Sequence, residues 1–330
     1  MNPSIRLGRV FGIPIGINYS WFIIFFLIGA SLYFWFARVS GDLGLGWGQA
    51  TLLGITGVTT VLFFVSLLVH ELSHSLVALA QGVPVRGITL FVFGGVSQIT
   101  RESASAKNEF TMAIVGPLSS FVLAAIFFGI FLASRDAAAV VAQPAQVLAV
   151  VNLILGVFNM VPGYPLDGGR VLRAILWGLT GSMERATRTA AGVGQLVGYL
   201  IIGYGIFLLL FAQNFLGGIW AIFIGWFLQN AASSSTQQMQ LRQSLQGYRA
   251  RDVMTQECPT IERGVDLETL VSEHILPTGR RFFVVVDDSR VEGLVSLTAV
   301  KGVPREAWRE TPVERAMVPV ERLRHVAPED

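Results

Sequence analysis

Six long apolar stretches dominate the pattern of hydrophobic and polar positions along the chain. A run of about 20 apolar residues is long enough to cross the hydrocarbon core of a bilayer as a helix. We therefore predict an all-α polytopic membrane domain over residues 1–230. Its expected spans are Tyr19–Phe36, Thr51–Ala80, Phe110–Ala133, Gln146–Val161, Gly192–Phe211 and Phe215–Leu228.

The segment Gly82–Thr100 does not follow the helical pattern. Short apolar alternations with Pro84, Gly87 and the pair Gly94-Gly95 predict strands and turns. The segment is also very apolar, and non-helical backbone at membrane depth must pack against protein or line a cavity. We expect a re-entrant β-hairpin whose free edge could pair with an extended peptide. A hairpin on the protein surface is the alternative.

The composition changes after the sixth apolar stretch. Residues 231–248 are rich in Ser and Gln, which predicts a linker or a short interfacial helix. Residues 249–330 predict a small soluble α/β domain. Its expected elements are a helix at Leu267–Ile275, a strand at Phe282–Val286, a turn at Asp287-Asp288, a strand at Val291–Ser296 and a helix from Thr298.

This soluble domain contains a weak internal repeat. Asp252-Val253-Met254 and the following Pro259-Thr260-Ile261 have counterparts in Arg315-Ala316-Met317 and Arg324-His325-Val326. The second copy stops shortly afterwards, at Asp330. We therefore expect a truncated second repeat.

Composition agrees with a membrane protein. Only 14% of the 330 residues are charged and 52% are hydrophobic, whereas a soluble domain has about 25% charged residues. The mean hydropathy is +0.59. A net charge of +2 does not favour binding to nucleic acid. The single Cys258 excludes an intrachain disulfide and a multi-cysteine metal cluster.

The basic residues of the loops predict the orientation. Six spans place both termini on one side of the membrane, and cytoplasmic loops carry an excess of Lys and Arg. With cytoplasmic termini, the other side receives only Arg38 and Arg135. We expect a multi-pass protein of the cell inner membrane with both termini in the cytoplasm, where the basic residues would be Arg6, Arg9, Arg86, Arg101, Lys107, Arg170, Arg173, Arg185 and Arg188.

The candidate chemistry lies in His70-Glu71-Leu72-Ser73-His74, directly after the uncharged run Thr51–Val69. Two histidines four residues apart lie on one face of a helix and can bind one metal ion. Glu71 could then take a proton from a water that the metal activates. Ionisable residues inside a membrane span usually mark a site, and a pair of helix-packing histidines is the disfavoured alternative.

A catalytic zinc ion usually has three protein ligands, so a third residue is needed. Asp167 is the best candidate, because it follows the fourth span on the same side of the membrane and precedes Gly168-Gly169. Glu184 is the rival, but the arginines around it are typical of an ordinary polar helix face. An isolated Asp at a helix end can also be a cap.

Three segments together resemble the site-2 protease family, which consists of intramembrane zinc metalloproteases that cut transmembrane substrates. They are His70–His74, the stretch Gly116-Pro117-Leu118-Ser119, and Asn159–Arg170 with its Leu-Asp-Gly core. The resemblance implies that one Zn²⁺ is bound by His70, His74 and Asp167, with Glu71 as the base. It further implies that Asn159 positions the substrate or its oxyanion, and that Gly94 and Gly95 are the glycine pair of the re-entrant hairpin.

The soluble domain resembles a cystathionine-β-synthase (CBS)-type domain. Pairs of such domains often bind adenine nucleotides and regulate an attached enzyme. Nucleotide-binding copies usually have an Asp where this chain has Ala299. The resemblance therefore favours a structural role, or a homodimer contact through this domain, at least as much as an adenine-nucleotide site.

These inferences predict a protease that lies in the lipid bilayer and hydrolyses a single-span transmembrane protein. The expected process is regulated intramembrane proteolysis, for example of an anti-sigma factor. A membrane metal sensor or transporter is the alternative. A transporter needs polar residues along a whole path, and the last two spans offer little beyond Gln195 and Gln229. An inactive scaffold is disfavoured because the set of ligands and base is complete.

Overall fold

The structure is a computed structural model that describes residues 4–92, 94–100, 103–245, 249–255, 258–288, 290–324 and 326–327, without the side chains of residues 235–245 and 253. The chain divides into two compact units, Met1–Arg242 and Gln243–Asp330. Each unit contains a four-stranded sheet and a buried core of its own.

The described part of the first unit is mostly helical. Six of its helices are long and apolar enough to cross a membrane, which confirms the prediction of six spans. An additional short helix, α5, follows α4. The helices are α1 (Ser20–Asp42), α2 (Gln49–Ala80), α3 (Ala106–Ser134), α4 (Ala139–Asn159), α5 (Asp167–Thr180), α6 (Met183–Leu210) and α7 (Phe215–Leu245).

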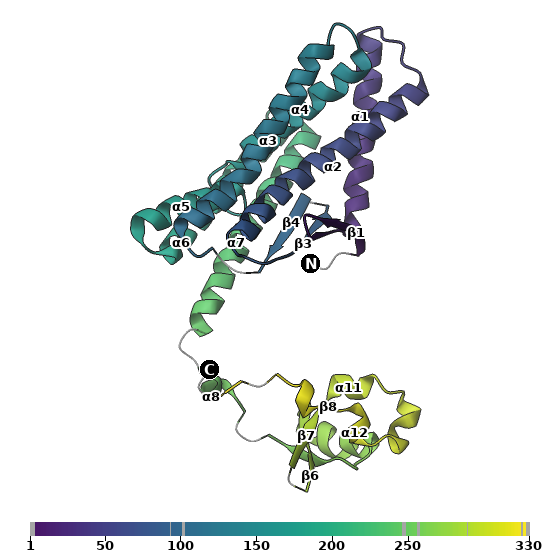
Figure 1. Cartoon of the computed structure of the whole chain (residues 1–330), viewed down its shortest axis with the longest axis vertical. Helices are drawn as coiled ribbons and strands as arrows, with labels where there is room; N and C mark the ends of the chain where they lie inside the picture. Colours follow the sequence, from purple (N-terminus) through teal and green to yellow (C-terminus); the bar gives the residue numbers. More distant parts are fainter. Residues whose placement is uncertain are drawn as a thin grey trace. The chain divides into compact units, whose positions relative to one another are not determined.

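Helix α2 is the central element of this unit, in contact with α1, α3, α4 and the sheet (Figure 1). Its 32 residues are long enough for about 48 Å of helix. The buried hydroxyl of Thr59 donates to the Ile55 carbonyl at 2.6 Å, and that of Ser66 donates to Leu62 at 2.9 Å. Such bonds to the preceding turn satisfy polar side chains inside an apolar helix.

A sheet packs against the C-terminal half of α2 (Figure 1). It consists of β1 (Ile5–Val10), β2 (Ile13–Ile17), β3 (Val85–Phe91) and β4 (Gly94–Ile99), in the order β1-β2-β3-β4. The β3–β4 pair is the antiparallel hairpin that the glycine pattern predicts. Strand β2 runs parallel to β3, with Ile15 opposite Ile88. Strand β4 is therefore an edge strand.

The sequence did not indicate strands β1 and β2. Gly8, Gly12 and Pro14 interrupt the alternation that marks a strand, and the partner strand β3 lies beyond two membrane spans. Burial of Ile13, Ile15 and Ile17 between the sheet and the helices stabilises the pairing.

Several predicted boundaries were wrong. Helix α1 ends at Asp42 rather than at Phe36, and α6 begins at Met183 rather than at Gly192. Helix α4 begins at Ala139 rather than at Gln146, and Pro144 lies inside it. Asp167 begins the separate helix α5 rather than closing the fourth span. Helix α7 continues to Leu245 rather than ending at Leu228, so most of the Ser/Gln-rich stretch 231–248 is helical, which agrees with the helical alternative predicted for it. Polar residues such as Gln have good helix propensity, so a change of composition alone did not end the helix.

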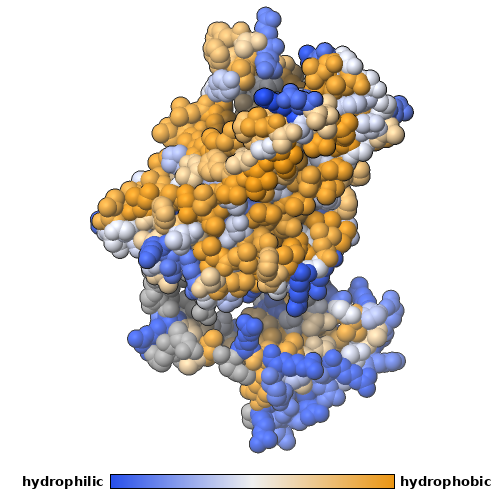
Figure 2. All heavy atoms as spheres, turned by 45° about the horizontal axis from the view of Figure 1, so that its top comes forward, coloured by the Kyte–Doolittle hydropathy of each residue, from blue (hydrophilic) through white to orange (hydrophobic). Residues whose placement is uncertain are grey.

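The surface of the first unit is largely apolar. Side chains such as Leu53, Val122 and Leu200 are more than half exposed, which would be unfavourable in water. Figure 2 shows hydrophobic side chains over most of the visible face of these helices. This surface fits contact with lipid, so the chain is a multi-pass membrane protein.

The second unit has a sheet with the order β5-β6-β7-β8 and an aliphatic core that includes Leu270, Val285 and Val295. The predicted strands and helices are present within one or two residues, whereas β5 and β8 were missed. Its elements are α8 (Ala250–Val253), β5 (Thr260–Glu262), α9 (Leu267–Thr269), the π-helix η1 (Leu270–Ile275), α10 (Leu276–Thr278), β6 (Phe282–Asp287), β7 (Arg290–Ser296), α11 (Leu297–Lys301), the 3₁₀ helix η2 (Arg305–Glu310), α12 (Val313–Ala316), β8 (Val318–Pro319) and the 3₁₀ helix η3 (Val320–Arg322).

The two copies of the predicted repeat begin in similar short helices, α8 and α12. Three residues of these predictions lie outside the described residues: Arg101 of the basic loops, and His325 and Asp330 of the repeat.

Candidate metal centre

His70, His74 and Asp167 come together in the first unit. The Nε2 atoms of His70 and His74 each lie 3.1 Å from Oδ2 of Asp167, and they lie 3.4 Å from each other. Both histidines are buried, with 3% and 4% of their surface exposed. Among the described residues these three form a group whose ligand atoms could hold one metal ion.

The spacing of these atoms fits a zinc ion. Ligand atoms about 2.1 Å from zinc at tetrahedral angles lie about 3.4 Å from one another. His74 Nδ1 donates to the carbonyl oxygen of Met112 at 2.6 Å, which leaves Nε2 of a neutral ring as an acceptor. That acceptor faces the carboxylate oxygen of Asp167, a second acceptor. Two acceptors this close need a cation or a proton between them, so the residues present fit a bound metal.

Helix α3 contacts the Nδ1 atoms of both imidazoles. Nδ1 of His70 lies 2.9 Å from the hydroxyl of Ser120, and Nδ1 of His74 is bound to Met112. Such contacts orient a ligand ring and fix its tautomer. The approach of α3 requires Gly116, because a Cβ there would lie 2.1 Å from Nε2 of His74.

Asp167 stands in the first turn of α5, where the partial positive charge of the helix N-terminus favours a carboxylate. The next two glycines allow the preceding loop to fold onto this turn. A Cβ on Gly168 would lie 2.4 Å from the Met160 carbonyl oxygen, and one on Gly169 would lie 2.3 Å from Gly163.

Glu71 lies beside the three residues and against strand β4. The hydroxyl of Ser97 donates to Oε2 of Glu71 at 2.9 Å. A Cβ on Gly95 would lie 2.5 Å from Cγ of Glu71, so only glycine permits this approach. The hairpin therefore fixes the carboxylate that the sequence indicates as the base.

The remaining predicted residues are not members of the group that could hold a metal ion. The amide of Asn159, at the end of α4, donates to the Leu155 carbonyl at 3.0 Å within its own helix. Gly94 begins β4 with a φ of +127°, a conformation that favours glycine. Glu184, the rival ligand, forms an exposed ion pair with Arg188 at 3.1 Å and is not part of the cluster.

A buried ion-pair cluster adjoins the candidate centre. Glu109 of α3 is 1% exposed and accepts hydrogen bonds from Arg170 and Arg173 of α5. Burial lowers the pKa of the Arg170 guanidinium, but Glu109 outweighs this effect and raises the pKa above its usual value. Arg170 therefore stays charged.

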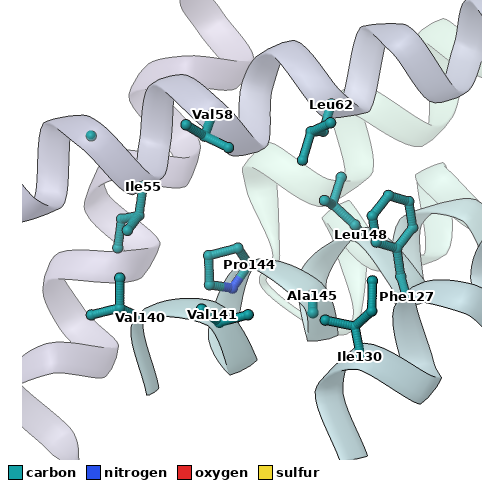
Figure 3. A pocket seen from close by; sticks show the side chains of 11 residues that line it. Ile55, Val58, Leu62, Phe127, Ile130, Val140, Val141, Pro144, Ala145 and Leu148 are labelled. Atoms are coloured by element: carbon teal, nitrogen blue, oxygen red, sulfur yellow. The ribbon is translucent and has the colours of Figure 1, made fainter. Parts of the chain in front are cut away.

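Two of the apolar cavities among the membrane helices differ in their position relative to the hairpin. One, of about 500 Å³, is lined by α1, α2, α4, α7 and the hairpin residues Val92 and Gly94. The other, of about 360 Å³, is lined by α2, α3 and α4 (Figure 3). No ionisable side chain lines this second cavity, and Ile55 on its wall is about 22 Å along α2 from His70. Only the first cavity adjoins the hairpin that touches Glu71.

The sequence indicated the candidate ligands but not the residues that contact their rings. Ser97 is two residues from Gly95 on one face of β4, and Ser120 is one turn from Gly116 on α3. These periodicities are the signal that could have identified both serines. Met112 acts through its backbone carbonyl, which leaves no side-chain signature.

The fold and the cluster define a class: a multi-pass membrane protein with a buried candidate metallohydrolase centre. The model of peptidase family M50 matches residues 58–138 and 133–203. Two bacterial proteins named "Putative zinc metalloprotease" are similar over most of the chain. Protein sll0528 of Synechocystis is 37% identical over 96% of this chain and 82% of its own length. Rip3 of Mycobacterium tuberculosis is 34% identical over 100% of this chain and 84% of its own length.

A solved structure, the site-2 protease from Methanocaldococcus jannaschii, is 27% identical and covers 70% of this chain and 94% of its own, with a TM-score of 0.47. The extent of the similarity to the two bacterial proteins shows the family. This chain belongs to peptidase family M50 and is a zinc metalloprotease.

Proposed function

We propose that this chain cuts single-span transmembrane proteins, such as an anti-sigma factor, in regulated intramembrane proteolysis at the inner membrane. The observation that carries the proposal is the group formed by His70, His74 and Asp167, with Glu71 beside it, in the C-terminal half of a helix long enough to span the membrane. A hydrolytic centre in that position acts on peptide bonds that lie in or near the bilayer.

His70, His74 and Asp167 are the proposed ligands of one Zn²⁺. Bound zinc supplies Lewis acidity, which lowers the pKa of water from 15.7 to about 7 and polarises a carbonyl group. Glu71 takes a proton from the attacking water on a carboxylate oxygen and passes it to the nitrogen of the leaving amine. Ser97 donates to Oε2 of Glu71 and so holds this carboxylate against strand β4.

The substrate is proposed to enter beside the hairpin. The cavity of about 500 Å³ is apolar, with aromatic residues such as Trp220 and Phe223 of α7 on its wall, and this lining suits a hydrophobic segment. Strand β4 is an edge strand, so an unwound peptide can pair with it near Gly94 and Gly95. Asn159 is proposed to contact the substrate or its oxyanion.

Cleavage of a co-expressed or co-reconstituted single-span protein tests the proposal. Glu71→Gln should retain about one zinc per chain and lose cleavage, whereas His70→Ala should lose both. Glu184→Gln removes a carboxylate outside the cluster and should change neither. Elemental analysis gives the zinc content, and mass spectrometry of the products maps the cut sites. Undiminished cleavage by Glu71→Gln would refute its role as the base.

The termini are proposed to be cytoplasmic, because most basic loop residues then lie on that side. Cys258 is the single cysteine of the chain and is exposed, so it reports the position of the second unit. A membrane-impermeant maleimide should label it in inverted vesicles and not in intact spheroplasts. The opposite pattern would reverse the orientation.

The second unit is proposed to be a CBS-like regulatory domain that forms a homodimer contact. Its sheet and short helices are compatible with such a domain. Ala299 lies in α11, where nucleotide-binding copies usually have an Asp. Equilibrium dialysis with ATP and AMP should therefore detect no binding, and analytical ultracentrifugation of the full chain should detect a dimer.

A further inference from the structure

Glu109 makes more contacts than a single ion pair needs. Its Oε1 accepts hydrogen bonds from Nε of Arg170 at 3.0 Å and from Nη2 of Arg173. Its Oε2 accepts from the hydroxyl of Ser103 at 2.5 Å. The carboxylate is almost fully buried, so both of its oxygens are satisfied by protein groups alone.

The contacts of Glu109 lead to two of the three proposed zinc ligands. Arg170 follows Asp167 by three residues, which is about one turn of helix α5. The same guanidinium reaches Sδ of Met112 with its Nη2 at 3.1 Å. Met112 accepts the hydrogen bond of His74 Nδ1 through its carbonyl oxygen. One carboxylate thus fixes the first turn of α5 against the segment of α3 that holds His74.

Stability alone does not account for this arrangement. Removing a carboxylate and two guanidinium groups from water costs several kcal/mol each, and well-packed apolar residues often stabilise a protein at least as well. What the ion pairs add is a defined geometry, because the planar guanidinium of Arg170 contacts Glu109 and Met112 at the same time.

We propose that Glu109 is a positioning residue of the metal centre, which acts through Arg170 to set the separation between Asp167 and His74. This inference rests on the ligand roles proposed above. Glu109 does not touch the metal or the substrate. It holds the helix that carries the carboxylate ligand in register with the helix that supports the imidazole.

The metal affinity of the full-length protein tests this role without an activity assay. Zinc affinity is measured by competition with a chromogenic chelator, and the geometry is followed by the visible absorption of the Co²⁺-substituted protein. Glu109→Gln and Arg170→Gln should each weaken zinc binding 10- to 100-fold and alter the Co²⁺ bands. Because Glu109 acts through Arg170, the two losses should not add up. The double variant should bind zinc about as tightly as the single variant with the lower zinc affinity.

The exposed pair of Glu184 and Arg188 provides the matched control. Glu184→Gln, Arg188→Gln and the double variant change the same groups away from the centre and should leave affinity and spectrum unchanged. Wild-type affinity in a folded Glu109→Gln variant would overturn the inference. Losses that multiply in the Glu109→Gln/Arg170→Gln variant would also overturn it, because the two residues would then act independently.

If Glu109→Gln does not fold, Arg170→Lys provides the test. Lysine keeps the charge beside Glu109 but has a single donor group in place of the planar fork. A folded Arg170→Lys variant should bind zinc about 10-fold more weakly. Unchanged affinity would refute the positioning role. A wild-type protein that bound no zinc would instead refute the ligand assignment and this inference with it.

Discussion

The two units of the chain use different forces to fix their side chains. Around the candidate metal centre, backbones and polar groups meet at glycines, and a Cβ on Gly116 would overlap a ring nitrogen of His74. In the second unit, aliphatic side chains such as Leu270 and Val285 form a continuous buried core. Lipid removes the hydrophobic force between helices, so small residues and hydrogen bonds must position the centre.

The largest expected effect is a loss of metal binding caused by one added methyl group, at Gly116. Gly116→Ala places a carbon 2.1 Å from Nε2 of His74 and 2.9 Å from Nε2 of His70, so the imidazoles must move apart. We expect loss of stoichiometric zinc and of cleavage, measured by elemental analysis and a substrate assay. Gly129→Ala lies on the same helix with no neighbour within 4 Å and should behave as wild type. Normal zinc content in Gly116→Ala would contradict the close packing.

The next effect is on stability and is confined to the second unit. Leu270 is fully buried, so Leu270→Ala should destabilise this unit by about 2–5 kcal/mol through a cavity and lost apolar burial. Hydrogen exchange of the full chain, followed by mass spectrometry, measures the opening of each unit. Leu276→Ala, at a position that is 73% exposed, is the control. Zinc content should not change, and its loss would show that the two units are coupled.

The smallest effect concerns an exposed ion pair. Arg263 contacts Asp287 at 2.7 Å and Glu314 at 2.8 Å, and the hydrogen bonds to these carboxylates raise the pKa of Arg263. Water and salt screen charges at such a surface. Arg263→Gln should therefore leave the unfolding midpoint nearly unchanged, in contrast to Glu109→Gln in the buried cluster. A loss of stability as large as that expected for Leu270→Ala would show that surface charge, rather than the aliphatic core, stabilises this unit.

The sequence predicted the elements whose signal is local. Uniform apolar runs identified six helices, and the spacing of His70 and His74 placed two imidazoles on one face. Because charged residues are rare in membrane spans, the sequence also indicated Asp167 as a candidate ligand. These features depend on residue type and on the period of the helix, which are both visible in one chain.

The sequence could not indicate features that depend on contacts between distant segments. Strand β2 is stabilised by β3, and the role of Met112 lies in a backbone carbonyl. Glu109 reads as an ordinary acidic residue at the start of a helix until Arg170 and Arg173 are placed beside it. All of these contacts depend on how distant segments pack, and the pattern of hydrophobic and polar residues does not indicate them.

The parallel pairing of β2 with β3 has a consequence for biogenesis. Two complete spans must be synthesised and inserted before the N-terminal strands meet their partner. The carboxylate of Asp167 emerges 93 residues after His74. With Asp167 as the proposed third ligand, a ribosome-bound intermediate holds the two imidazoles without their acidic partner, and the proposed metal centre is completed only late in synthesis.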